Sequence, residues 1–272
     1  MEQTTSYTPW QPYISQLRMA CGTGSDTGIT LKQKPNEDSL FAYQCIQTYN
    51  SQIQSFGVFL VADGMGGHAY GQVASYIAIQ VISKSVLLPL LTNANAKDES
   101  LSSLLISSIQ LANQSIYEYN QQNRVNMGTT ATAVLVVDSN AYIANVGDSR
   151  AYHYREQDGL RQITLDHSVV AHLIQAGKIT ADDMYSHPKR NQISRNLGGK
   201  TDVKVDLFTV SLLPGDKLLL CTDGLWEMVR DTEIQRIISS PVDPSAVSTL
   251  LVQAALAGGG NDNVSVVVVN VN

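Results

Sequence analysis

Acidic residues stand where the apolar runs of this chain begin or end. The clearest case is the run 56–62, which ends on Asp63 and is followed by a glycine-rich segment. The acids at such positions are Glu37, Asp38, Asp63, Asp148, Asp223 and Asp262. A single acid at a strand end is ordinarily a turn residue that accepts backbone hydrogen bonds. Because the pattern recurs along the whole chain, we expect several of these strand ends to converge.

Converging carboxylates repel one another unless a cation lies among them. No cluster of histidine or cysteine accompanies these acids, so the ligand set is all oxygen and suits Mg²⁺ or Mn²⁺ rather than Zn²⁺. Gly64 follows Asp63 and leaves its backbone carbonyl open to an ion, because no side chain stands in the way. The pattern therefore predicts a magnesium or manganese site in which a rigid strand holds Asp63.

The length of 272 residues, of which 43% are hydrophobic, suits one large domain with a sizeable core. We expect residues 1–16 to be a polar lead-in and residues 17–272 to form that single domain. The net charge of −6 and the scattered Lys and Arg residues argue against nucleic-acid binding. We expect a monomer.

Three features favour a cytoplasmic protein without a membrane segment. Cys21, Cys45 and Cys221 lie far apart and form no disulfide framework. The first residues lack the basic and apolar regions of a signal peptide. The longest aliphatic run, 86–91, contains a proline and is far too short to span a bilayer.

Hydrophobic periodicity predicts strands and helices throughout the chain. Strands are expected at 17–22, 39–46, 56–62, 128–137, 141–146, 150–155, 160–163, 203–210, 216–221 and 264–269. Helices are expected from about 71, from about 98 to 116, and at 167–176, 180–184, 231–239 and 243–257. In the first helix Val73, Ile77 and Val81 form the expected core face. Hairpin-linked strands and paired helices indicate a layered α+β domain with sheets inside and helices outside.

Nine short motifs follow one another in a specific order. They are PNED, VADGMGGH, GTTA, NVGDSRAY, LDHS, GKIT, HPKRNQISRNLG, CTDGLWE and GGNDNVSV. The ordered set, from about Ser25 to Val269, resembles the bacterial metal-dependent Ser/Thr protein phosphatases of type 2C. The resemblance implies a four-layer αββα sandwich, in which two central antiparallel β-sheets are flanked by antiparallel α-helices.

The resemblance also implies a binuclear site for Mg²⁺ or Mn²⁺. Asp63 would bridge the two ions, while Asp223 and Asp262 would hold the first, and these three form the implied catalytic set. The Gly64 carbonyl would serve the second ion, with the acidic pair at 37–38 acting directly or through water. Two close dications lower the pKa of a bridging water, and the resulting hydroxide attacks phosphorus in line.

A weaker third ion and a mobile segment are implied as well. Asp148 would help to bind the third ion together with Asp223, and residues from about 166 to 197 would form a flap beside the active site. Every acid of the set is present, which argues against an inactive relative. The implied substrates are phosphorylated proteins of a Ser/Thr kinase pathway.

Two positions depart from the family pattern. The arginine that usually binds substrate phosphate is replaced by Gln33, and either Lys32 or Lys34 could supply the missing charge without the two-donor fork of arginine. The alternative that both lysines are only solvated stays open. The histidine that follows Asp-Gly in eukaryotic members is Met65 here, and for the nearby His68 a structural or solvated role is favoured over that of general acid.

Other conspicuous residues receive structural interpretations. We expect Arg150 to brace its turn by pairing with an acid and Trp226 to lie in the core. The threonines at 129–130 are interpreted as small residues that let backbones approach. Asp166 is expected to cap a flap helix that starts at His167. Within the flap, Lys189 and Arg190 are either a solvated turn or contacts for a substrate peptide.

The leading interpretation is a protein serine/threonine phosphatase, and two alternatives remain. One is a catalytically weak phosphoprotein-binding regulatory module of the same fold, which the complete set of acids opposes. The other is a hydrolase of small phosphate esters. The sequence shows no CxxxxxR loop and no DxDxT run, so neither a thiol nor an aspartyl nucleophile is indicated.

Overall fold

Two antiparallel β-sheets form the centre of the molecule. The computed structural model describes residues 17–49, 52–66, 70–92 and 98–272, so the expected lead-in and His68 lie outside the described residues. The strands are β1 (Met19–Asp26), β2 (Asp38–Tyr49), β3 (Gln52–Met65), β4 (Gly128–Thr129), β5 (Ala131–Val137), β6 (Asn140–Val146), β7 (Arg150–Arg155), β8 (Gly159–Gln162), β9 (Asp206–Ser211), β10 (Lys217–Cys221) and β11 (Val264–Val271). One sheet has the order β1-β11-β10-β7-β8 and the other β2-β3-β5-β6-β9, with β4 paired to β3.

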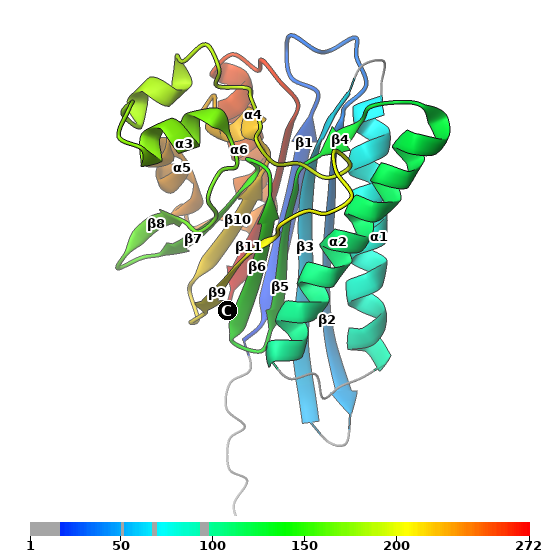
Figure 1. The fold of residues 1–272 in the computed structure, drawn as a ribbon. Helices are drawn as coiled ribbons and strands as arrows, with labels where there is room; N and C mark the ends of the chain where they lie inside the picture. Colours follow the sequence, from blue (N-terminus) through cyan, green and yellow to red (C-terminus); the bar gives the residue numbers. More distant parts are fainter. Residues whose placement is uncertain (1–16, 50–51, 67–69, 93–97) are drawn as a thin grey trace, which may run out of the picture.

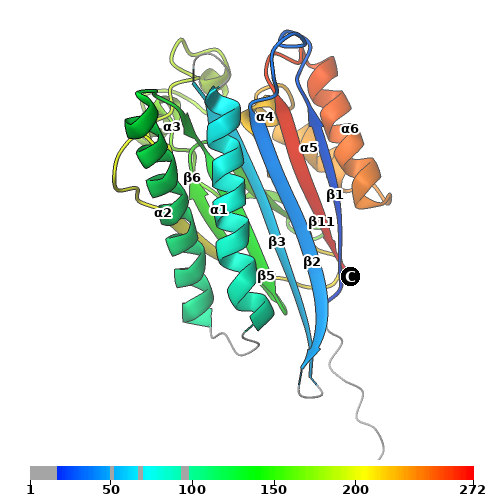
Figure 2. The ribbon, with the colours of Figure 1, turned by 90° about the vertical axis from the view of Figure 1, so that its right-hand side faces the viewer.

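Helices cover the outer faces of both sheets. Figures 1 and 2 show α1 (Tyr70–Thr92) and α2 (Asp98–Asn123) on one side and α5 (Asp231–Ile238) and α6 (Pro244–Ala257) on the other. The remaining short helices are α3 (Val169–Gln175), the 3₁₀ helix η1 (Asp182–Tyr185) and α4 (Asp223–Trp226). The expected four-layer αββα sandwich is confirmed.

Strand β3 shows how the sequence builds these layers. Val58 and Leu60 point into the core beneath α1 and α2, whereas Phe59 and Val61 belong to the core between the two sheets. All four side chains are at most 1% exposed. Because successive side chains of a strand point to opposite faces, only a continuous apolar run can bury both faces.

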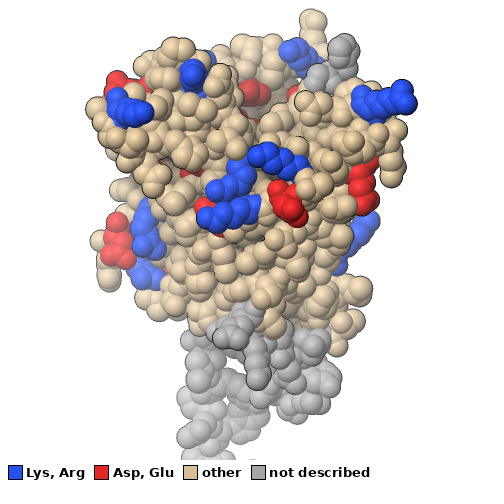
Figure 3. Space-filling model, in the orientation of Figure 1, with Lys and Arg blue, Asp and Glu red and all other residues tan. Residues whose placement is uncertain are grey.

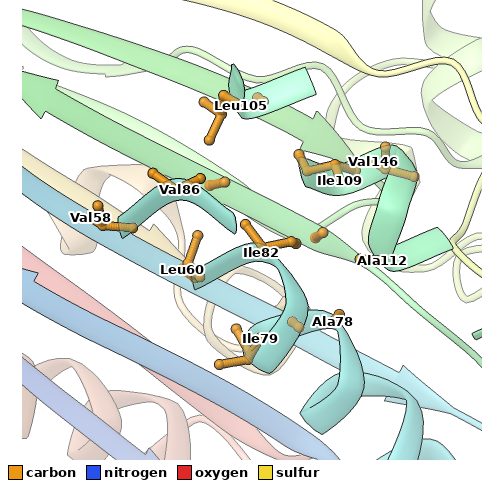
Figure 4. Packing of buried hydrophobic residues seen from close by; sticks show 14 of the residues in the cluster. Val58, Leu60, Ala78, Ile79, Ile82, Val86, Leu105, Ile109, Ala112 and Val146 are labelled. Carbon is orange, nitrogen blue, oxygen red and sulfur yellow. The ribbon is translucent and has the colours of Figure 1, made fainter. Parts of the chain in front are cut away.

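The buried face of α1 differs from the expected one. Val73, Ile77 and Val81 are only partly buried at the margin of the core. The core residues of α1 include Ala74. Figure 4 shows four others, Ala78, Ile79, Ile82 and Val86, between the sheet and α2. The small alanines allow the helix to lie close to the sheet. The prediction of the buried face missed them because it relied on large aliphatic residues.

Several element boundaries also differ from the predictions. The strand expected at 128–137 is interrupted at Thr130, and Asp223 begins α4 instead of lying in a loop. The strand expected from 203 begins at Asp206. The cap of α3 is Ser168, whose side chain accepts a hydrogen bond from the Ala171 backbone, so the expectation of a cap by Asp166 was wrong.

Helix α1 is long and apolar enough to cross a membrane by length and composition alone. Its most apolar window has a mean hydropathy of 1.6, which the short run 86–91 did not reveal. In that window 44% of the residues are buried inside the protein, and the helix packs on the six-stranded sheet. The apolar character is that of a core helix.

Candidate metal centre

Asp63 and Asp38 face each other at one end of the six-stranded sheet. They are paired residues of β3 and β2. The Asp63 backbone is fixed by Thr130, whose hydroxyl accepts a hydrogen bond from the Asp63 N–H at 2.8 Å. The Thr129 hydroxyl donates to the Asp63 carbonyl at 2.8 Å. The two threonines thus do more than let backbones approach, because their hydroxyls fix the peptide units on both sides of the Asp63 side chain.

Thr222 links this end of the six-stranded sheet to the other sheet. Its hydroxyl donates to Asp38 Oδ2 at 2.8 Å and accepts a hydrogen bond from the Ser265 backbone N–H at 2.9 Å. Thr222 follows β10 directly and precedes Asp223, the first residue of α4. One buried hydroxyl therefore holds an acid of one sheet beside an acid that the other sheet delivers.

Asp262 is delivered by the turn between α6 and β11. Its Oδ1 accepts a hydrogen bond from the Asn263 N–H at 2.8 Å. The Asn263 side chain accepts a bond from the Glu37 N–H at 2.7 Å and donates to the Thr27 carbonyl at 2.9 Å. Asn263 therefore ties the turn of Asp262 to the segment that carries Glu37.

Gly64 lies where three backbones meet. Its N–H donates to the Glu37 carbonyl at 3.1 Å. A Cβ at Gly64 would lie 2.0 Å from the Gly71 carbonyl oxygen, and a Cβ at Gly71 would lie 2.7 Å from the Glu37 carboxylate. A side chain at Gly64 would collide with the backbones of Gly71 and Glu37, and one at Gly71 would collide with the Glu37 carboxylate and the Gly64 carbonyl, so both positions require glycine.

Asp148 reaches the centre from the loop after β6. It is 2% exposed, and its backbone carbonyl accepts a hydrogen bond from Trp226 Nε1 at 3.1 Å. Trp226 is buried, as expected, and the guanidinium of Arg150 stacks over its ring at 3.8 Å. Arg150 also pairs with Asp166 at 2.7 Å, which confirms the expected partnership with an acid.

Burial and mutual repulsion raise the pKa of these carboxyl groups. Burial, followed by the charge of Asp223, raises the pKa of Asp63 well above its usual range. Burial, followed by the charge of Asp148, does the same for the pKa of Asp223. Burial also raises the pKa of Asp38 and of Asp148 to about 7. The acids thus lie close enough to oppose one another's ionisation, as the sequence pattern predicted.

The donor set fits a hard dication. Asp38, Asp148 and Asp223 each keep one buried carboxylate oxygen without a hydrogen-bond partner. Unpaired buried carboxylate oxygens are unfavourable unless a cation satisfies them. In the described part of the chain no group of three or more His, Cys, Asp or Glu side chains is arranged so that it could hold a metal ion by itself. An ion held by these acids would need further oxygen ligands, such as the Gly64 carbonyl and water, and Mg²⁺ usually keeps several waters of this kind.

The expected phosphate-binding lysines differ in position. Both Lys32 and Lys34 are exposed. The charge of Lys34 opposes the rise in pKa that burial causes at Glu37 and Asp262, and no such influence of Lys32 is found among the described residues. Of the two lysines, Lys34 is therefore the one whose charge acts on these two acids.

Residues 166–197, the expected flap, place a cation near an acid that was not among the predicted site residues. Arg190 lies near Glu227, whose pKa burial raises and the Arg190 charge lowers. Glu227 follows Asp223 by one helical turn, so the two share a face. Lys189 is exposed, and its backbone N–H donates to His187 Nδ1 at 3.1 Å. Figure 3 shows acidic side chains in a recess at the top of the molecule.

Several supporting residues were also missed, although each stands beside a predicted acid. Thr222 and Asn263 are direct neighbours of Asp223 and Asp262, in the segments Cys-Thr-Asp-Gly and Asn-Asp-Asn. A small polar residue directly beside a strand-end acid is the sequence feature that could have predicted these supports.

Of the cysteines, only Cys221 is fully buried, while Cys21 and Cys45 are partly exposed.

A two-sheet sandwich with an acidic, all-oxygen centre at one end is an arrangement that suits metal-dependent hydrolysis of phosphate esters. Comparison with known families gives the particular group. A sequence model described as "Protein phosphatase 2C" matches residues 30–254, and the chain belongs to this family. It is a protein serine/threonine phosphatase that depends on Mn²⁺ or Mg²⁺.

Individual relatives agree with this assignment. The chain is 38% identical over 217 residues to the serine/threonine phosphatase Stp of Listeria innocua, covering 79% of this chain and 84% of the relative. The Mycobacterium tuberculosis phosphatase PstP/Ppp superposes with a TM-score of 0.78 at 33% identity, over 94% of this chain and 98% of that one. The catalytic domain of PstP in complex with two manganese ions gives a TM-score of 0.77 at 31% identity, over 94% and 99%.

Proposed function

We propose that the acidic centre holds two core ions and one weaker ion. Asp63 would be a ligand of both core ions, and Asp223 and Asp262 would be further ligands of the first. The Gly64 carbonyl serves the second ion, with the acids at 37–38 acting directly or through water. Asp148 shares the weaker third ion with Asp223. The single observation that carries this proposal is the set of buried, unpaired carboxylate oxygens on acids that both sheets deliver.

The bound ions supply an activated water and neutralise charge on the phosphoryl group. The chain's own residues supply a rigid frame. Thr130 and Thr129 hold the backbone of Asp63, so that its carboxylate keeps one position while the phosphoryl group reacts. Thr222 orients the Asp38 carboxylate by donating to one oxygen and leaving the other free.

Lys34 is the proposed contact for the substrate phosphate, since it lies beside Glu37 and Asp262. Arg190 is the proposed flap contact, with Lys189 at the margin. An ammonium group offers a point charge and lacks the two-donor grip of arginine. Lys32 is assigned to the solvated surface.

The substrates are phosphoproteins, and we assign them to a serine/threonine kinase pathway. We further propose a cytoplasmic monomer formed by residues 17–272, with 166–197 as its flap and without nucleic-acid or membrane partners. The packing of α1 on its sheet supports the last point, because a core helix is not available to lipid.

A substrate comparison tests the proposal. Phosphoserine and phosphothreonine peptides and a free phosphometabolite are each assayed with Mn²⁺, with chelator, and with Mn²⁺ restored. The proposal predicts reversible, metal-dependent turnover that favours the peptides. Preference for the metabolite would support a small-ester hydrolase, and absence of turnover in all metal-loaded assays would support a non-catalytic binding module.

A further inference from the structure

The entry of the proposed flap bonds to the loop that carries Asp148, and the exit of the flap bonds to its entry. At the entry, the backbone N–H of His167 donates to the Gly147 carbonyl at 3.0 Å. At the exit, the Ser194 N–H donates to the His167 carbonyl at 2.8 Å. Arg195, next in the chain, pairs with Asp206 at 2.7 Å. Since Gly147 directly precedes Asp148, the flap base and this acid share one hydrogen-bonded junction.

The imidazole of His167 adds a second bond to Gly147. The Gly147 backbone N–H donates to His167 Nδ1 at 2.9 Å. Because a backbone N–H can only donate, Nδ1 is the acceptor and the ring proton lies on Nε2. Nε2 lies 3.1 Å from Asp206 Oδ2 and donates to it. Asp206, braced by Arg195, thereby fixes the tautomer and the orientation of the ring.

Gly147 depends on these bonds for its conformation. Its φ of 109° lies in a region that L side chains rarely adopt, and a Cβ there would lie 2.5 Å from Thr130 Cγ2. The residue therefore has no side chain that could fix the loop. Its N–H is held by His167 Nδ1, and its carbonyl is held by the His167 N–H and by Asn145 Nδ2 at 3.2 Å.

We propose that His167 is a positioning residue that orients the peptide before Asp148 and so links the flap to the weaker metal position. The inference rests on the proposed role of Asp148. His167 is only 4% exposed and acts through Gly147, not on the substrate. The Gly147 N–H requires an unprotonated Nδ1, and burial acts in the same sense because it lowers the pKa of His167.

Two variants separate the two ring contacts. His167→Asn places an amide oxygen near the position of Nδ1 and keeps an acceptor for Gly147. His167→Gln places its amide nitrogen near Nε2, keeps the donor to Asp206 and loses the acceptor. We expect His167→Gln to raise the Mn²⁺ concentration for half-maximal turnover by about tenfold, since small misplacements of catalytic groups have large effects. His167→Asn stays close to wild type.

His153→Gln is the matched control. His153 is likewise buried and bonds an acid through Nε2, Asp216 at 2.9 Å, but it lies on β7 without a bond to Gly147. Its Mn²⁺ dependence should equal that of wild type. Equal curves for His167→Gln and wild type would overturn the proposal, and so would equal losses in His167→Gln and His167→Asn.

A second readout does not require activity. Amide hydrogen exchange at Gly147 in chelator should be faster in His167→Gln than in wild type or His167→Asn. In the wild-type protein, the ¹⁵N shifts of His167 should show a protonated Nε2 and an accepting Nδ1. The opposite tautomer would overturn the proposal even if both variants failed to fold.

Asp148→Asn separates this inference from the function on which it rests. If Asp148→Asn leaves the Mn²⁺ dependence unchanged, the assignment of Asp148 fails, and the inference fails with it. If Asp148→Asn raises the Mn²⁺ requirement and His167→Gln does not, the positioning role alone fails. A rise in both variants, with faster Gly147 exchange only in His167→Gln, supports the inference.

Discussion

Single hydroxyl and amide groups decide how the acids of the centre are held. The positions of Asp63, Asp223 and Asp262 could be predicted because a strand-end acid is visible in the sequence. Their supports could not, since Thr222 is 184 positions from Asp38 in the chain and meets it only after both sheets have formed. The sequence also did not show whether Lys32 or Lys34 contacts the substrate phosphate, because both lie in one turn and only the fold shows which acids each lies near.

The lysine assignment gives a prediction at this scale. Lys34→Ala should raise KM by roughly threefold to fivefold, the size expected for an exposed charge interaction, with little effect on kcat. The reason is that the contact already exists in the bound substrate. Lys32→Ala is the control and should match wild type in steady-state kinetics on one phosphopeptide. Equal KM values for all three proteins would remove Lys34 from the phosphate site.

A buried ion pair joins the segment proposed as the flap to the sandwich. Arg150 of β7 and Asp166 at the flap entry are 4% and 5% exposed at their side chains. The sequence predicted an acidic partner for Arg150 but did not show which acid, because the turn after β8 determines which acid lies beside Arg150.

The strands of the sandwich were easier to predict, because a continuous apolar run such as that of β3 is stable only where both faces of the strand are buried.

Breaking this pair should destabilise the domain. Asp166→Asn leaves a buried guanidinium without its counter-charge, so we expect the free energy of unfolding to fall by about 3 kcal/mol in urea denaturation. Glu233→Gln is the control, because its partner Arg236 is 71% exposed, and it should show no measurable change. Equal effects in the two variants would mean that burial of the first pair has no energetic consequence.

At the scale of the whole molecule, the two sheets bring like charges together at one end. The native pKa of Asp38 and of Asp148 is about 7, against an unperturbed value near 4. Between these values the native state binds more protons than the unfolded state. The free energy of unfolding of the chelated protein should therefore fall as pH rises through this window.

Denaturation in chelator at pH 5.5 and pH 7.5 measures this effect. Each additional proton held by the native state contributes about 1.4 kcal/mol per pH unit. The lowered pKa of His167 makes the free energy of unfolding rise with pH, but this is the effect of one group against that of several acids. With Mn²⁺ the trend should reverse, because ions bind the deprotonated acids. Higher stability of the chelated protein at pH 7.5 would contradict the convergence of these carboxylates.

The central claim is that Asp63 bridges two ions, and electron paramagnetic resonance of bound Mn²⁺ tests it most directly. Two Mn²⁺ ions that share a carboxylate interact magnetically and give a spectrum unlike that of isolated ions. We predict the interacting spectrum for the wild-type protein loaded with Mn²⁺ and only isolated-ion signals for Asp63→Asn. Isolated-ion signals in the fully loaded wild type, or an interacting pair that persists in Asp63→Asn, would contradict the account.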